Sequence, residues 1–289
     1  MIVLDKMDKS YYTVRDTQHY RYKLQFDIKS LGNKYPNAHI YVGDPLKPCL
    51  SLSVPLKDSL DVYRNFDEDS ISVAFLNRLE NIHTCLLNDV GPANQEQHSF
   101  TKEMFNDVMN IIRKNYPHIH HIKFVDTSFI PCGEDDTLEL MYYYIAVRSE
   151  SWYETNFQAY FLPKKKYIAY RCSVDQYSSE ETKKSISWGD FYTSYLSYTN
   201  DYAKPIINEH IETIKHMYET SLTLPAFLKV MATIVPRSEK CKFFKGWLVS
   251  LLERFDIIPL KTWFINLYNV DRKHFTGGRR QTRKQKHKL

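Results

Sequence analysis

The sequence has little glycine and no closely spaced cysteines. Only 8 of its 289 residues are glycine, which argues against an architecture dominated by loops or glycine hinges. The five cysteines are odd in number and lie far apart, at Cys49, Cys85, Cys132, Cys172 and Cys241. Without a CxxC pair, this pattern indicates neither a zinc ribbon nor a disulfide framework. We therefore expect reduced thiols and an intracellular setting.

Long apolar runs are also missing. No stretch approaches the roughly 18–20 apolar residues of a membrane span. The first ten residues, MIVLDKMDKS, lack the apolar core of a signal peptide. We expect a chain without a membrane span and without a secretory leader.

The motifs of several large enzyme classes do not occur. There is no GxSxG elbow, no P-loop, no HExxH helix and no GxGxxG after a strand pattern. Acidic pairs such as Asp135-Asp136 and Glu180-Glu181 lie in loop-like segments, where solvated charge is the simpler interpretation. Classical hydrolase, kinase and dehydrogenase chemistry therefore has no support in the sequence.

Positive charge is concentrated at the C-terminus. The formal net charge is +5, from 39 Lys and Arg against 34 Asp and Glu. Six cations and no acid follow Gly277-Gly278, so the rest of the chain has a net charge of −1; the six are Arg279, Arg280, Arg283, Lys284, Lys286 and Lys288. Such a polycation can bind nucleic acid or an acidic protein in a salt-dependent way. The alternative is a solubility or targeting appendage without a specific partner.

Apolar and polar residues alternate in the first part of the chain. Period-two alternation over residues 20–28, 37–42 and 49–54 predicts strands of an antiparallel meander. Residues 71–79 form a short apolar stretch that periodicity leaves open as strand or helix. Aromatic residues make up 15% of the chain, which suits either half-buried surfaces and interfaces or a compositional bias.

Helical periodicity begins at residue 99. Met104, Phe105, Val108, Ile111 and Ile112 recur at three- and four-residue steps, which predicts a helix over residues 99–116. A buried strand is expected over 119–125 and a second helix over 136–157. Residues 160–172 suggest strand, turn and strand. Further helices are predicted over 207–218, 225–235 and 238–255.

These elements predict an α+β fold. We expect a mostly antiparallel N-terminal sheet with packed helices and a helical C-terminal subdomain. The predicted division is a core domain over residues 1–176, the helical subdomain over 177–270 and a flexible basic tail over 271–289.

Histidines cluster beside the predicted strand. His118 and His120 would project to one face of a strand, with Asp126 on the same parity, which is compatible with metal ligation. Histidines next to a helix that ends at a proline are more often surface or capping residues. We therefore predict no metal site.

The middle of the chain resembles an uncharacterised protein family of giant nucleocytoplasmic DNA viruses. Members have a "yP…i.l.D.S" strand followed by a "WYE..F.A" helix end, and short basic tails after Gly-Gly are common in proteins of such viruses. The matching segments here are residues 115–117, 122–128 and 151–159. The resemblance covers about residues 80–170 and implies a viral protein of the host cytoplasm or the virion. It implies no particular activity.

The same region resembles the second half of the GNAT acetyltransferase core. That core runs helix, strand, helix and ends in a "lYek.GF" pattern, which Tyr153-Glu154 and Phe157 match. The resemblance implies acetyl-CoA as the cofactor and Tyr153 as the general acid toward the departing thiolate. It also implies a phosphate-binding turn near Gly91, before the first of the two helices.

The sequence near Gly91 departs from the acetyltransferase pattern. Residues 90–99, VGPANQEQHS, contain one glycine, no arginine, an acid and a proline. Pro92 removes a backbone donor that a pyrophosphate would need. The sequence therefore favours a non-enzymatic accessory or virion-associated protein of a large DNA virus. An N-acetyltransferase with Tyr153 as general acid, and a protein that binds nucleic acid through its tail, are the alternatives.

Overall fold

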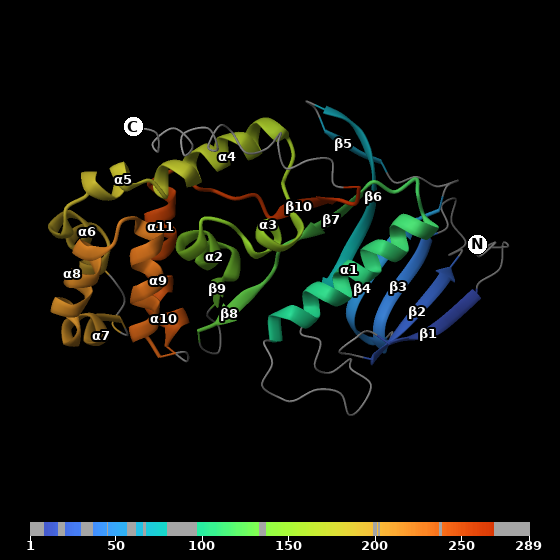
Figure 1. Ribbon diagram of the computed structural model, residues 1–289, viewed down its shortest axis with the longest axis horizontal. Helices are drawn as coiled ribbons and strands as arrows, with labels where there is room; N and C mark the ends of the chain where they lie inside the picture. Colours follow the sequence, from blue (N-terminus) through green and yellow to red (C-terminus); the bar gives the residue numbers. More distant parts are fainter. Residues whose placement is uncertain are drawn as a thin grey trace, which may run out of the picture. The chain divides into compact units, whose positions relative to one another are not determined.

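The computed structural model describes residues 9–16, 21–29, 37–44, 46–56, 62–65, 68–79, 97–132, 137–198, 201, 203–236 and 239–268. The chain divides into two compact units. The first unit comprises Met1–Phe124 and Phe264–Leu289, and the second comprises Val125–Trp263. Strands dominate the first unit and helices the second, so the predicted α+β class is confirmed (Figure 1).

Eight of the described strands form one sheet, in the order β1-β2-β3-β4-β6-β7-β10, with β5 paired to β6. Strand β6 pairs in parallel with β7, whereas β1 with β2, β2 with β3, β3 with β4, β4 with β6 and β5 with β6 pair antiparallel. The strands are β1 (Lys9–Asp16), β2 (Arg21–Lys29), β3 (Asn37–Asp44), β4 (Lys47–Pro55), β5 (Val62–Asn65), β6 (Glu68–Leu79), β7 (His121–Val125) and β10 (Thr262–Asn266).

The predicted meander is confirmed, and its alternation explains its burial. Ile40 in β3 pairs with Leu52 in β4, and both side chains are fully buried. Apolar side chains at every second position cover one face of the sheet with hydrocarbon. The stretch over residues 71–79, for which the sequence did not decide between strand and helix, is a strand, since it belongs to β6.

A long helix connects the two parallel strands. Helix α1 (Gln97–Asn115) confirms the first predicted helix, and it buries Met104, Phe105, Val108 and Ile112 as one stripe. It ends just before Pro117, and β7 follows as expected. Parallel neighbours need a crossover of this length, because a tight turn can only reverse the chain.

The predicted helix over residues 136–157 is wrong as a single element. The hairpin strands β8 (Phe129–Pro131) and β9 (Thr137–Glu139) come first, and α2 (Leu140–Arg148) and α3 (Trp152–Phe157) follow as separate helices. Ser149 ends α2 with a left-handed backbone at φ 62°, and the Ser151 side chain caps α3. A left-handed residue followed by an N-cap stops one helix and starts another.

The predicted strand–turn–strand over residues 160–172 is also wrong. This segment enters α4 (Lys164–Tyr177), which begins after Pro163. The buried residues of α4 are Tyr167, Tyr170, Val174 and Tyr177, at three- and four-residue steps. The helical period is present in this segment. Its aromatic and β-branched side chains have a high intrinsic preference for strands, and the prediction of strands followed that preference.

Helices continue to residue 253, which confirms the helical C-terminal region. Breaks at His210 and at Gly246-Trp247 divide two of the predicted helices. The described helices here are α5 (Glu180–Ser185), α6 (Trp188–Ser194), α7 (Ala203–Glu209), α8 (Ile211–Thr220), α9 (Leu224–Ile234), α10 (Lys240–Lys245) and α11 (Leu248–Glu253), with a short 3-10 helix η3 (Leu196–Tyr198). Their core is aromatic: the ring of Phe191 contacts those of Tyr218, Phe227 and Trp247, and Tyr218 contacts Phe227.

The two compact units do not follow the predicted boundary at residue 176. That position lies within α4, one residue from its end, whereas the chain passes from the first unit to the second at residue 124 and returns at residue 264. The return occurs inside β10, a strand that the sequence analysis did not predict. The predicted tail over residues 271–289 lies outside the described residues.

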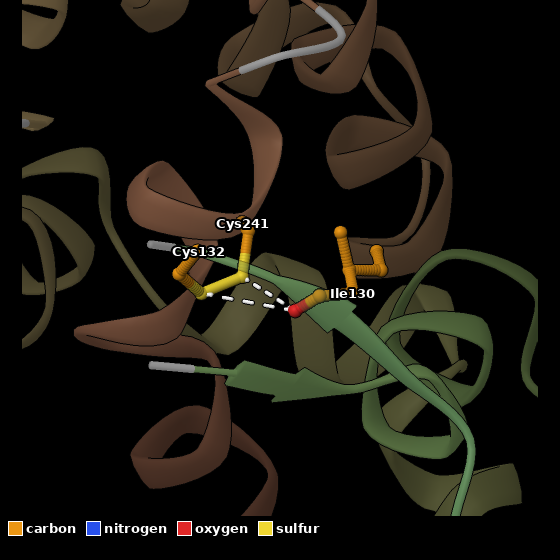
Figure 2. Close-up of a disulfide and its surroundings, with 3 residues drawn as sticks. All are labelled: Ile130, Cys132 and Cys241. Carbon is orange, nitrogen blue, oxygen red and sulfur yellow. Dashed lines mark hydrogen bonds between the residues drawn. A yellow bond between two sulfur atoms is a disulfide. The ribbon is translucent and has the colours of Figure 1, made fainter. Parts of the chain in front are cut away.

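The expectation of reduced cysteines is wrong for at least three of the five. Cys132 and Cys241 form a disulfide (Figure 2), and Cys49 is also disulfide-bonded. Cys172 is a free, exposed thiol. The sequence did not predict these disulfides, because the spacing of the cysteines resembles no disulfide framework.

In the described part of the chain, every helix is too short or too polar to cross a bilayer.

Candidate functional site

The candidate site begins where β7 ends. Asp126 directly follows β7, and its backbone N–H donates to the carbonyl of Lys261 at 2.8 Å. This places Asp126 at the carboxyl end of a parallel strand, a position at which sheets that contain parallel strands often bind ligands. The Asp126 residue is only 6% exposed.

A tight turn holds the Asp126 carboxylate. The backbone N–H of Ser128 donates to Oδ1 of Asp126 at 3.0 Å, and the Ser128 hydroxyl donates to the same oxygen. An Asp side chain that bonds the backbone two residues on is a common turn-forming arrangement. Burial raises the pKa of the Asp126 carboxyl, and the two bonds from Ser128 partly offset that rise.

Tyr153 lies near this carboxylate, in the first turn of α3. Burial raises the pKa of its phenol well above the ordinary value, and the negative charge of Asp126 raises it further. The side chain is half-buried and its ring stacks edge-on against Trp152. Tyr153 therefore holds its proton at neutral pH and is a donor rather than a base.

An ion pair lies beside the turn. Lys261 Nζ and Glu139 Oε1 are 2.8 Å apart, and both side chains are at least a third exposed. Glu139 raises the pKa of Lys261, while the charge of Glu139 also contributes to the raised pKa of Asp126. This pair is exposed, so its direct contribution to stability is small. Its two charges act on Asp126 in opposite directions, since Glu139 raises the pKa of that carboxyl and Lys261 lowers it.

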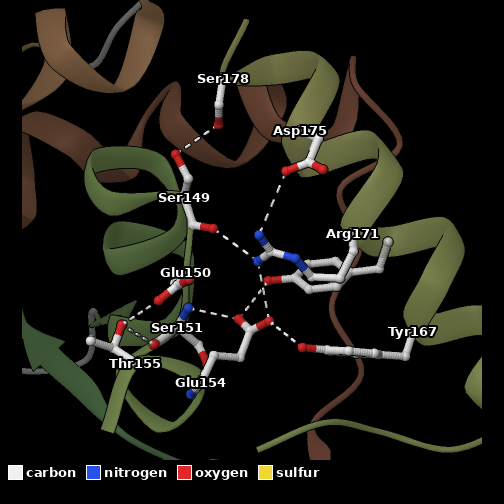
Figure 3. A network of polar contacts seen from close by, with 10 residues as sticks. Ser149, Glu150, Ser151, Glu154, Thr155, Tyr167, Arg171, Asp175 and Ser178 are labelled. Carbon is white, nitrogen blue, oxygen red and sulfur yellow. Dashed lines mark hydrogen bonds and ion pairs between the residues drawn. The ribbon is translucent and has the colours of Figure 1, made fainter. Parts of the chain in front are cut away.

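A second buried carboxylate, Glu154, is the next residue after Tyr153. Its side chain is 4% exposed and accepts hydrogen bonds from four donors (Figure 3). The donors are the Ser151 backbone N–H at 2.8 Å, the Tyr167 hydroxyl at 3.0 Å, the Tyr170 hydroxyl at 3.0 Å and Arg171 Nη1 at 3.2 Å.

The Glu154 cluster, defined as Ser151, Glu154, Tyr167, Tyr170 and Arg171, joins α3 to α4. Ser151 and Glu154 form a capping box, since the Ser151 hydroxyl also accepts the Glu154 backbone N–H. Burial raises the pKa of Glu154, and Arg171 and the other donors work against that rise. The carboxylate is matched by enough donors to be stable when charged.

Of the site residues predicted from the sequence, the structure describes some and not others. Tyr153 lies in the described site, beside Asp126. Gly91 lies outside the described residues, as do all the basic tail positions from Arg279 to Lys288.

The two histidines each have a contact within the first unit. Nε2 of His118 is 2.9 Å from the carbonyl oxygen of Pro55, and His120 packs edge-on against Tyr268. Among the described residues, no group of three or more His, Cys, Asp and Glu side chains is arranged to hold a metal ion.

Sequence reasoning missed Ser128, Lys261 and Arg171. The Asp-x-Ser pattern directly after a predicted strand is a recognisable turn signal and would have identified Ser128. Lys261 and Arg171 have no such local signal, because they reach their partners only through the tertiary fold.

Comparison of the chain with protein-family models, with curated proteins and with solved structures found no match to any of them.

Proposed function

We propose that this chain is a non-enzymatic accessory or virion-associated protein of a large DNA virus. The observation that carries the proposal is the Glu154 cluster. The segment that resembles acetyltransferases, residues 151–159, uses its carboxylate and its N-cap to hold α3 on α4. The "WYE" pattern is thus explained by its structural role, and no catalytic role is needed to account for it.

The rest of this segment also contributes to packing. Trp152 contacts the rings of Tyr153 and Phe157, and Phe157 and Ala159 are buried. The sequence over residues 90–99, with one glycine and Pro92, supports the same proposal because it offers few backbone donors to a pyrophosphate.

The proposal is tested by thermal unfolding of the full chain with CoA and with acetyl-CoA. We expect the unfolding midpoint to change by no more than about 1 °C at ligand concentrations far above those that saturate acetyltransferases. A saturable shift of several degrees would replace this proposal with the acetyltransferase alternative. Mass spectrometry of purified virus particles then separates a packaged protein from an accessory protein of the infected cell.

A second candidate function is N-acetyl transfer, and the electrostatic effect of Asp126 on the nearby Tyr153 phenol favours it. A protonated phenol beside a buried carboxyl is an arrangement that general acid–base chemistry uses. Helix α1, taken alone, has no acid in its first turn, which suits a phosphate group at its N-terminus. Pro92 and the scarcity of glycine before α1 are unfavourable for a phosphate group at that position.

Acetyl-CoA would supply the acetyl group for this second function. The contribution of the chain would be the proton on Oη of Tyr153, available to a departing thiolate. The direct measurement is release of free thiol from acetyl-CoA in the presence of an amine. A rate equal to that without protein would remove this candidate.

The basic tail supports a third, separate proposal, nucleic-acid or acidic-protein binding by the six cations from Arg279 to Lys288. It rests on charge alone and is independent of the Tyr153 site.

A further inference from the structure

Cys132 and Cys241 bring together two elements that are distant in sequence. Cys132 follows β8, Cys241 lies in α10, and 109 positions separate them. Their Cα atoms are 5.0 Å apart, within the range for disulfide-bonded pairs. Both residues are buried, with 6% of Cys132 and 1% of Cys241 exposed.

The surroundings of this pair also suit the reduced form. The carbonyl oxygen of Ile130 lies 3.0 Å from Sγ of Cys241 and 3.9 Å from Sγ of Cys132 (Figure 2). A Cys241 thiol can donate a weak hydrogen bond to this carbonyl, whereas a disulfide sulfur has no proton to donate. The buried site thus accommodates a thiol pair as well as a disulfide.

We propose that Cys132 and Cys241 form a redox-controlled link between the β8–β9 hairpin and α10. This inference does not depend on the proposed function. In the oxidised state the S–S bond ties the hairpin to α10 covalently. In the reduced state only packing and the weak Cys241–Ile130 hydrogen bond hold the two together.

The oxidation is a two-electron exchange with a small-molecule or protein disulfide. The thiolate of one cysteine attacks a sulfur of the oxidant and releases one thiol, which leaves a mixed disulfide. The thiolate of the other cysteine then attacks the protein sulfur of that mixed disulfide and releases the second thiol. Two protein thiols lose two protons and two electrons, and the oxidant disulfide becomes two thiols.

The hairpin leads directly into the candidate site. Ser128, which holds Asp126, immediately precedes β8, and its carbonyl accepts the backbone N–H of Leu140 at 3.0 Å. Glu139 ends β9 and forms the ion pair with Lys261. A hairpin released from α10 therefore frees both sides of the Asp126 turn to move.

Burial makes the link slow to exchange. An attacking thiolate must reach a sulfur that is nearly closed to solvent, so exchange requires the hairpin to open first. Cys172, which is free and exposed, needs no such opening and serves as the internal comparison.

The first experiment equilibrates the full chain with glutathione disulfide, quenches it in acid, alkylates free thiols in denaturant and maps the digested peptides. We expect the Cys132 and Cys241 peptides to be recovered as one cross-linked species and Cys172 to be alkylated or glutathionylated. Recovery of Cys132 and Cys241 as separate alkylated peptides would overturn the proposal. This measurement uses only the wild-type chain, so it does not depend on a variant that folds.

The second experiment compares unfolding midpoints under oxidising and reducing conditions. Loss of a native disulfide that closes a long loop is expected to lower Tm by roughly 5–10 °C, so oxidised wild type should exceed the double variant Cys132→Ser, Cys241→Ser by that amount. Under reducing conditions the difference should nearly vanish. The Cys172→Ser variant is the matched control and should follow the wild type in both conditions.

The double variant is needed because Cys49 is also disulfide-bonded, so a reductant alone does not act on one link. Hydrogen exchange then locates the effect. Amides of β8, β9 and α10 should exchange several-fold faster in the double variant than in oxidised wild type, with β3 unchanged. Equal exchange in both segments would contradict the link.

Discussion

Two buried carboxylates of the second unit, Glu154 and Asp126, have very different surroundings. Glu154 accepts four hydrogen bonds from donors that include the guanidinium of Arg171. Asp126 accepts two, both from Ser128 and both on Oδ1. The nearby cation Lys261 pairs with Glu139 instead.

This difference identifies Glu154 as a structural carboxylate. A buried carboxylate with all its acceptor positions filled has no capacity for a ligand, and it holds its donors in place. The two hydrogen bonds described for Asp126 both come from the adjacent turn. Asp126 acts on Tyr153 through its charge, which helps to raise the pKa of the phenol, whereas the hydrogen bonds of Glu154 link α3 to α4.

Replacement of Glu154 by alanine should have the largest effect on stability. It leaves Arg171 without its main partner and two buried tyrosine hydroxyls without an acceptor. We expect the free energy of unfolding to fall by about 3–5 kcal/mol. Urea unfolding followed by circular dichroism measures the change.

The Glu154→Gln variant is the control for shape. It keeps the side-chain volume and one oxygen acceptor, so its loss should be clearly smaller than that of Glu154→Ala. Equal stability of Glu154→Ala and the wild type would show that the cluster does not hold α3 on α4.

Paired removal of two tyrosine hydroxyls sharpens the comparison. Tyr167→Phe deletes a donor to Glu154 and should cost about 1–2 kcal/mol, since it leaves a charged acceptor short of one bond. Tyr153→Phe deletes a hydroxyl that does not bond Glu154 and should cost less. Denaturant titration of both variants tests the order.

The Tyr153→Phe and Tyr167→Phe variants also test for catalysis. If the chain transfers acetyl groups, Tyr153→Phe should lower the rate by about 10²–10⁴-fold, while Tyr167→Phe should leave it nearly unchanged in the folded fraction. Equal rates for Tyr153→Phe and the wild type would remove Tyr153 as a general acid.

The Asp126→Asn variant should change how stability depends on pH. Burial raises the pKa of Asp126, so the folded chain keeps this proton to a higher pH than the unfolded chain does. Wild type should therefore lose stability relative to Asp126→Asn as pH rises from about 3.9 through the raised folded value, by at most about 1.4 kcal/mol per pH unit. Chemical unfolding from pH 3.5 to 7 gives the two curves. A stability difference that stays constant with pH would be incompatible with the raised pKa.

The smallest effect on the folded part is expected from removal of the basic tail. A chain that ends at Thr276 should keep the unfolding midpoint of the full chain, since both carboxylates lie in the second unit. Its nucleic-acid binding should be weaker and less salt-dependent, with a loss of up to about 5 in the slope of log K against log salt concentration if all six cations contact phosphates. Equal affinity and slope in both chains would exclude the tail as the binding element.

Sequence patterns predicted the elements whose signals are local and regular. The alternation in β3 and β4 and the stripe of Met104, Phe105 and Val108 in α1 each place apolar residues on one face, and burial follows. Patterns failed over residues 136–172, where helix ends depend on a left-handed Ser149 and on Pro163. A single residue sets each of these helix boundaries. The hydrophobic period is a property of a window of many residues, so it does not reveal a boundary that one residue sets.

Prediction of the candidate site was partial for a similar reason. Tyr153 was named from a resemblance, and Asp126 was considered only as a metal ligand. The contacts of Asp126 with Ser128 follow from an Asp-x-Ser turn, which is local. The contact with Lys261 requires β10 to lie beside β7, which no local pattern indicates.

The antiparallel meander, helix α1 and the separation of a basic tail from a nearly neutral body all follow from neighbours in the chain, whose hydrophobic period and charge can be read directly. Three features depend instead on the tertiary structure: the return of β10 to the sheet, the four donors around Glu154 and the Cys132–Cys241 disulfide. Each joins segments that meet only after chain entropy has been lost over long loops, so each depends on the stability of the whole fold.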